Sequence, residues 1–211
     1  MNTTRIILLN LLTAVLLSQT VSAQSPSEGD THKATAREAQ IFDFDLTKPL
    51  PTYNEQDGYG YDILPAPDVK KSGEPFYFSV RVPDGNYLVR VVLGGKKFTS
   101  TTIRAEGRRL MIHNAETTGK KQMLTVEFVV NKRSPLIEGD KRVKIKEREK
   151  DYLTWDDRLT LEFNGAAPAV RSIHIEAVKD VPTIYLCGNS TVVDQNYEPW
   201  ASWGQMITRW F

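Results

Sequence analysis

The sequence predicts a mainly β protein, in which an antiparallel β-sandwich over residues 39–180 is followed over 182–211 by the first β-turn-α unit of an α/β domain. Two observations predict the sandwich: short runs alternate apolar and polar residues, and turn residues separate the runs without a helical period. In residues 123–131 the alternation is typical of a strand with one buried and one solvated face. A third observation predicts the second unit, because the pattern after Pro182 becomes continuously apolar and then helical.

The first 23 residues have the features of a secretory signal peptide. Arg5 supplies the positive start, and Ile6–Leu17 is an apolar stretch too short to span a bilayer. Val21–Ala23 then offers small residues for cleavage; an uncleaved membrane anchor is the alternative. Residues 24–38 are polar and predict a flexible linker. We therefore expect an exported, bacterial-type protein in the periplasm or outside the cell.

Composition narrows the class of partner. Cys187 is the only cysteine, so no intramolecular disulfide can form and the fold must depend on its core. Loss of Arg5 with the signal peptide brings the formal charge from +1 to zero, which gives no case for binding nucleic acid or, after signal cleavage, a membrane surface. We expect a neutral or small partner. The oligomeric state stays open.

The expected strands begin after residue 39. Phe76–Val82 and Tyr87–Val91 flank Pro83–Asn86, whose proline and glycine suit a tight turn. Further runs with strand character follow at 98–105, 109–113, 123–131, 158–164 and 170–178. This succession of short strands is typical of a sandwich.

Residues 131–157 interrupt that pattern with interleaved lysine, arginine and glutamate. A solvated loop and strand edge is the favoured interpretation, since the acidic residues are spread throughout the stretch. A contact surface for an acidic polysaccharide is the alternative.

The segment after Pro182 is the most informative for chemistry. Thr183–Cys187 has the pattern of a strand buried on both faces, and it leads directly into Gly188–Thr191. Several hydrolase folds use such a strand and turn, ahead of a helix, to expose a serine nucleophile, so Ser190 is the leading catalytic candidate. A helix N-cap or turn residue is the alternative role for Ser190. The helix that follows would carry an apolar stripe formed by Trp203, Met206, Ile207, Trp210 and Phe211.

Two short motifs carry a family resemblance. Gly188–Asp194 followed by Trp203–Gln205 resembles the first conserved block of the GDSL (SGNH) hydrolases, and within them is most similar to the rhamnogalacturonan acetylesterases. The resemblance implies that Ser190 is the nucleophile, that its backbone N–H is an oxyanion donor, and that the second unit opens a flavodoxin-like α/β domain. Asn189 stands where the family has aspartate; its amide can still support the turn as an acceptor.

Parts of the sandwich also resemble a module that precedes the catalytic domain in exported members of this family. These parts are Phe42–Phe44, Gly58–Asp62, Tyr152–Asp157 and Leu159–Phe163. The resemblance implies a galactose-binding-like sandwich. It also implies an acetylesterase acting on acetylated pectic polysaccharide of the plant cell wall, without metal or other cofactor.

The remaining catalytic groups of that family are a glycine, an asparagine and an Asp-x-x-His histidine in later blocks that this sequence does not contain. Its three histidines are His32 in the linker, and His113 and His174 in strand patterns. His174 lies between two isoleucines and is expected to point outward. The sequence therefore predicts a truncated, inactive N-terminal part of an esterase. Its unpartnered stripe would favour association or a frayed helix, with protease cleavage near Pro182.

Aromatic side chains support a second hypothesis, a non-catalytic carbohydrate-binding or spacer sandwich. Tyr59 and Trp155 are the candidate sugar-stacking residues, although both also suit ordinary packing and a tight turn at Gly58 and Gly60. Asp156–Asp157 is weak evidence for half of a calcium site.

Overall fold

The computed structural model describes residues 40–68 and 73–211. The predicted signal peptide, the linker up to residue 38 and His32 lie outside the described residues. Within the described part of the chain, no helix is long and apolar enough to cross a membrane.

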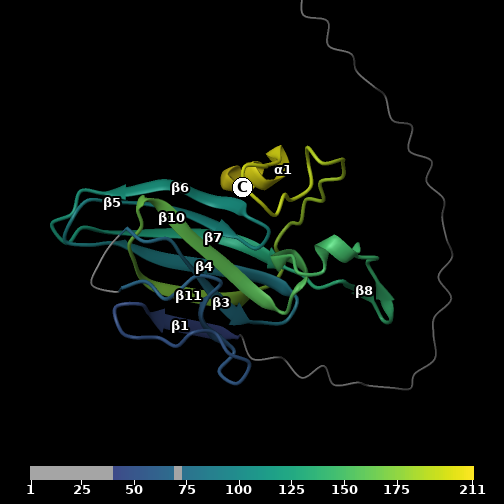
Figure 1. The fold of residues 1–211 in the computed structure, drawn as a ribbon, viewed down its shortest axis with the longest axis horizontal. Coiled ribbons are helices and arrows are strands. Elements are labelled where there is room, and N and C mark those ends of the chain that lie inside the picture. The colour runs from purple at the N-terminus through teal and green to yellow at the C-terminus, as the bar shows by residue number, and fades with distance from the viewer. Residues whose placement is uncertain (1–39, 69–72) are drawn as a thin grey trace, which may run out of the picture. The chain divides into compact units, whose positions relative to one another are not determined.

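Two antiparallel sheets form the sandwich, as predicted (Figure 1). The first sheet has four strands in the order β1 (Ile41–Asp45), β11 (Val170–Val178), β4 (Gly85–Gly94) and β7 (Met123–Lys132). The second sheet has five strands in the order β2 (Tyr59–Asp62), β3 (Phe76–Arg81), β10 (Arg158–Ala167), β5 (Thr99–Ala105) and β6 (Arg109–Thr117). Every pairing within the two sheets is antiparallel, so the period-two pattern of the sequence places alternate side chains on opposite faces.

The apolar side chains of that pattern meet between the sheets. Phe78 and Leu161 of the second sheet and Val89 and Ile173 of the first have no exposed surface. Phe44 contacts the ring of Phe78 edge-on, with centroids 4.9 Å apart. Burial of each such side chain contributes about 1.5–3 kcal/mol, and these contacts hold the two layers together.

The charged stretch over 131–157 forms the end of β7, a small hairpin and two short 3-10 helices. The hairpin pairs β8 (Leu136–Glu138) with β9 (Lys141–Arg142), and the helices are η1 (Glu147–Glu149) and η2 (Leu153–Trp155). Its charges pair locally, with Lys150 Nζ 2.6 Å from Glu147 Oε2. The stretch is mostly exposed, which agrees with the solvated loop.

The strand predicted over Thr183–Cys187 does not form. Residues 182–188 are exposed and have no strand assignment, and their backbone groups bond to no partner in the described chain. A strand that is apolar on both faces needs a neighbouring strand on each side. No described strand pairs with this segment, so its apolar side chains remain in solvent.

The predicted helix is present as α1 (Trp203–Ile207), which continues as the 3-10 helix η3 (Thr208–Trp210). Both elements contact β6 in the second sheet, as Figure 1 shows for α1. The helix meets the sandwich through the buried Gln205, which bonds to Gly107, whereas the buried Gly204 packs against Val192. The apolar stripe is largely solvent-exposed, with Trp210 71% and Phe211 81% exposed. We call residues 189–211 the tail.

Candidate functional site

The turn that carries Ser190 is organised by Asn189. The Asn189 side-chain oxygen accepts hydrogen bonds from the backbone N–H and the hydroxyl of Thr191, at 3.0 and 2.8 Å. The Asn189 carbonyl accepts from the N–H groups of Val192 and Val193, at 2.9 and 3.2 Å. The amide thus makes the acceptor contacts that a carboxylate would make here, without its charge.

Ser190 is exposed, and its reactive groups are unengaged. Among the described residues, neither its hydroxyl nor its backbone N–H makes a hydrogen bond. Its carbonyl, by contrast, accepts a hydrogen bond of 2.9 Å from the side-chain amide of Gln195, which also donates to the Val193 carbonyl. The carbonyl of Ser190 is therefore held by Gln195, while its N–H and hydroxyl have no hydrogen-bond partner among the described residues.

A shallow hollow of about 390 Å³ adjoins this serine. Its lining residues are Ser190, Thr191, Gln195, Trp200, Ala201 and Trp203. Trp200 is 69% exposed and Trp203 is 50% exposed, so both side chains lie at the edge of the hollow. A small ester group could lie between these indole rings and Ser190.

Gln205 attaches the helix to the sandwich. Its side-chain amide donates to the carbonyls of Gly107 and Gln195, at 2.5 and 2.9 Å, and is fully buried. Its oxygen accepts from the N–H of Ser202, whose hydroxyl caps the N–H of Gln205 in return. This capping box fixes the start of α1.

The preceding glycine permits a close approach. A Cβ on Gly204 would collide with the Val192 carbonyl oxygen, and the Trp203 N–H donates to the Thr191 carbonyl at 3.0 Å. The helix therefore starts directly against the Ser190 turn. This contact explains why a glycine stands between Trp203 and Gln205.

The sandwich side of this junction is the tight turn between β5 and β6. Glu106 and Arg108 in this turn have left-handed backbone angles, with φ of 54° and 63°, although neither is glycine. All three turn residues, 106–108, are buried. We call this turn, Glu106–Arg108, the docking turn.

Arg108 of the docking turn reaches into the tail. One of its terminal nitrogens, Nη1, donates to the carbonyls of Gln195 and Trp200, at 3.1 and 2.9 Å. The other, Nη2, pairs with Glu198. Glu198 also meets Arg104 of β5 at 3.0 Å, and these arginines hold its pKa below the usual value.

Two buried carboxyl groups lie at the same junction. Burial raises the pKa of Glu106 to about 8, and the Glu106 side chain accepts a hydrogen bond of 2.9 Å from the Thr160 N–H of β10. Burial also raises the pKa of Asp194, opposed by the charges of Arg109 and Arg133. Asp194 Oδ2 and Arg109 Nε are buried without a hydrogen-bond partner in the described chain. The junction therefore contains buried polar atoms, including these two carboxyl groups.

The histidines are engaged elsewhere. His174 points outward from β11, as predicted, and its Nδ1 lies 2.7 Å from Asp43 Oδ1 of β1. His113 of β6 contacts Asn114. Neither histidine is hydrogen-bonded to Ser190, so no described imidazole is in place to take its proton. The free Cys187 is exposed.

The two candidate sugar-stacking residues, Tyr59 and Trp155, each contact a neighbouring side chain. Tyr59 packs against Phe44, with ring centroids 5.0 Å apart. One face of Trp155 is covered by the guanidinium of Arg133 at 5.6 Å. Both rings therefore have packing roles that the sequence allowed as the alternative.

The described residues contain no cluster of three or more side chains suited to a metal ion. In the weak calcium candidate, Asp156 pairs with Arg158 and Asp157 with Arg81, at 3.1 and 2.9 Å. Both carboxylates are thus balanced by arginines.

Sequence reasoning missed the docking turn and its arginine. Glu106-Gly107-Arg108 reads as an ordinary polar turn, and its contacts lie 87 to 98 residues away along the chain. A glycine between two charged residues was the only local sign. Gly107 is required because a Cβ there would lie 2.6 Å from Thr154 Oγ1 and 3.1 Å from Asp194 Oδ2.

Comparison with known proteins identifies no family. No protein-family profile and no curated protein sequence matches the chain. The structure is similar to a crystal structure of protein YXIM from Bacillus subtilis, with 19% identity over 81% of this chain and a TM-score of 0.39. It is also similar to an Arthrobacter globiformis T6 isomalto-dextranase complexed with panose, with 13% identity over 64% of this chain and a TM-score of 0.30. The chain spans 51% of the first of these structures and 23% of the second, and at these TM-scores neither likeness bears on function.

Proposed function

We propose that this chain is the N-terminal part of an exported carbohydrate esterase, similar to the rhamnogalacturonan acetylesterases, and that the tail presents its nucleophile. One observation carries the proposal: Ser190 leaves both its hydroxyl and its N–H unengaged beside a hollow, while its carbonyl is fixed by Gln195. A serine that served only as a helix cap would use its hydroxyl on the backbone. Here that role belongs to Ser202.

The chemistry is acyl transfer. Ser190 Oγ attacks the acetyl carbonyl carbon, its proton passes to a base, and the Ser190 N–H donates to the oxygen that becomes negative. Collapse of the tetrahedral species releases the sugar hydroxyl and leaves acetyl-Ser190, which water hydrolyses to acetate. The described residues supply the nucleophile and one oxyanion donor. Because no described histidine contacts Ser190, we expect the chain by itself to have no esterase turnover.

An added base makes the proposal testable on this chain. The purified chain is incubated with an aryl acetate, with and without imidazole, and acetylated residues are located by peptide mass spectrometry. We expect acetyl-Ser190 to appear only with imidazole, at least tenfold above the reference hydroxyls Ser172 and Thr183. Ser190→Ala removes the signal, Asn189→Ala weakens it by loosening the turn, and Asn189→Asp retains it. Ser190 labelling no greater than that of Ser172 and Thr183 would refute the proposal.

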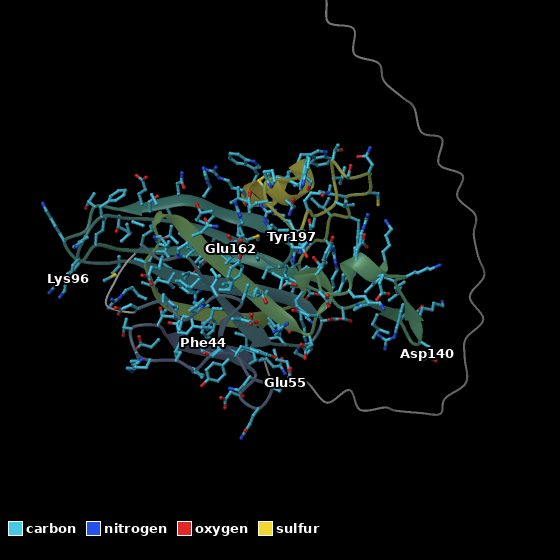
Figure 2. The ribbon with its side chains drawn as sticks, viewed as in Figure 1. Phe44, Glu55, Lys96, Asp140, Glu162 and Tyr197 are labelled. Carbon is cyan, nitrogen blue, oxygen red and sulfur yellow. The ribbon has the colours of Figure 1, made fainter. Side chains whose placement is uncertain are left out.

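A second candidate is a non-catalytic carbohydrate-binding module, and a separate hollow favours it. This hollow, of about 610 Å³, is lined by three cationic side chains, those of Lys96, Lys97 and Arg171, and by two acidic ones, those of Asp68 and Glu74. None of the three cations forms an ion pair with another described residue. Lys96 lies at the end of the sandwich away from Tyr197 of the tail (Figure 2). Unpaired cations would suit the carboxylates of a pectic polysaccharide.

Affinity electrophoresis in gels containing polygalacturonate tests this candidate. Retardation that is lost in Lys97→Ala and kept in Trp155→Ala would support binding at this hollow. Equal mobility with and without the polysaccharide would leave the sandwich as a spacer.

A further inference from the structure

The docking turn of the sandwich is connected to Ser190 by a short chain of hydrogen bonds. Arg108 Nη1 donates to the carbonyl of Gln195 at 3.1 Å. The side chain of that same Gln195 donates to the carbonyl of Ser190 at 2.9 Å. The Gln195 carbonyl also accepts from Gln205 at 2.9 Å, so its position is fixed from two directions. Gln195 is thus held by the sandwich through its backbone and holds the candidate nucleophile through its side chain.

The same arginine shapes the hollow beside the serine. Its second acceptor is the carbonyl of Trp200, at 2.9 Å, and Trp200 lines the hollow together with Gln195 and Ser190. Bonds from a guanidinium to carbonyl oxygens are charge-assisted, and its planar fork fixes the direction of both acceptors. The loop between Ser190 and Trp203 is therefore fastened near its middle by a sandwich residue.

The docking turn has left-handed backbone angles at two residues that are not glycine. A left-handed conformation at Glu106 and Arg108 is strained relative to the same turn built with glycine or asparagine. In this conformation Arg108 extends to the tail, and the Gly107 carbonyl accepts from Gln205. Strain of this kind persists where surrounding contacts determine the geometry, and here most of those contacts are made by the tail.

We infer that Arg108 is a positioning residue for Ser190, acting through Gln195, so that the β-sandwich is a working part of the acyl-transfer site. This inference rests on the proposed function for the role of Ser190. It assigns to the sandwich a task that neither a spacer nor a separate sugar-binding module performs. Arg108 itself touches neither Ser190 nor the space where an ester would lie, and it acts by setting the direction of the Ser190 carbonyl through Gln195.

The test compares Arg108→Ala, Arg108→Lys, Gln195→Ala and the double variant, with Arg90→Ala as the matched control. Arg90 pairs with Glu127 on the first sheet and makes no hydrogen bond to the tail. Two quantities are measured for each: imidazole-driven acetylation of Ser190, and the amide resonance of Thr191, whose peptide group contains the Ser190 carbonyl.

We expect Arg108→Ala and Gln195→Ala each to shift the Thr191 resonance and to lower Ser190 acetylation about tenfold. The double variant should lose little more than either single one, because both act in one chain of contacts. Arg108→Lys should restore part of the acetylation, since an ammonium can reach one of the two carbonyls. Arg90→Ala should match the unmodified chain.

Two outcomes overturn the inference: a Thr191 resonance and an acetylation rate that are unchanged in Arg108→Ala, or losses that add fully in the double variant. Absence of Ser190 acetylation in the unmodified chain would instead refute the proposed function. The Thr191 resonance then decides by itself whether Arg108 fixes the Ser190 backbone.

Discussion

Gln205→Ala should release the tail from the sandwich while leaving the sandwich folded. The side chain of Gln205 makes three hydrogen bonds in a fully buried position, to Gly107, Gln195 and the N–H of Ser202. At about 1 kcal/mol for each bond, the substitution costs about 3 kcal/mol, and the abandoned carbonyls add to that cost. A tail of this length has no core of its own and depends on this junction.

Hydrogen exchange measured by mass spectrometry reads this local stability directly. A loss of about 3 kcal/mol corresponds to a fall of about a hundredfold in the protection of tail amides. Strands β4 and β10 should keep their protection. Gln122→Ala is the matched control, because among the described residues Gln122 bonds only with Thr118 and Gly119, in an exposed turn of the sandwich. Equal tail protection in Gln205→Ala and Gln122→Ala would refute the assignment of Gln205 as the residue that attaches the helix.

Three further predictions follow from the structure. Glu106 has a pKa of about 8 in the folded protein, above its unfolded value, so the native state retains a proton that the unfolded state releases. Between about pH 4.5 and 8 the contribution of Glu106 to the free energy of unfolding should therefore fall by about 1.4 kcal/mol per pH unit. In urea titrations, Glu106→Gln should reduce the difference in unfolding free energy between pH 5 and pH 8. An equal difference in the variant and the unmodified chain would contradict this prediction. Limited proteolysis should cut within exposed residues 182–188, yet both fragments should co-elute under native conditions, whereas release of the tail on cutting would count against the junction. Gly60→Ala should prevent folding or cost several kcal/mol, because its Cβ would lie 2.5 Å from the Pro51 carbonyl oxygen at a φ of 148°; a melting temperature close to that of the unmodified chain would disprove this.

The sandwich was predictable because its information is local. The alternation of apolar and polar residues in 123–131 and 170–178 predicts which side chains are buried. The structure confirms this, because Phe128, Val130, Ile173 and Ile175 lie in the core. The outward direction of His174 followed from the same rule. One buried face per strand is enough to determine such a sheet.

The arrangement of the tail was less predictable, since it depends on partners that are distant in sequence. The pattern of Trp203, Trp210 and Phe211 predicted an apolar face without a partner sheet, and these three rings are exposed, but nothing in the pattern indicated that Gln205 would bond to the sandwich. The pattern of Thr183–Cys187 indicated a strand, but a strand forms only with neighbours to bond with. Helix periodicity gives the position of a face and not the identity of its partner.

The shared Gln195 carbonyl has a consequence for how the chain acquires its structure. Because that one oxygen accepts from both Arg108 and Gln205, the tail reaches its final shape only against a completed β5–β6 turn. The sandwich is synthesised before the tail, so it is available as a template when the tail emerges. The turn around Ser190 then forms against an existing surface. An error in the β5–β6 turn of the sandwich would therefore also displace Ser190.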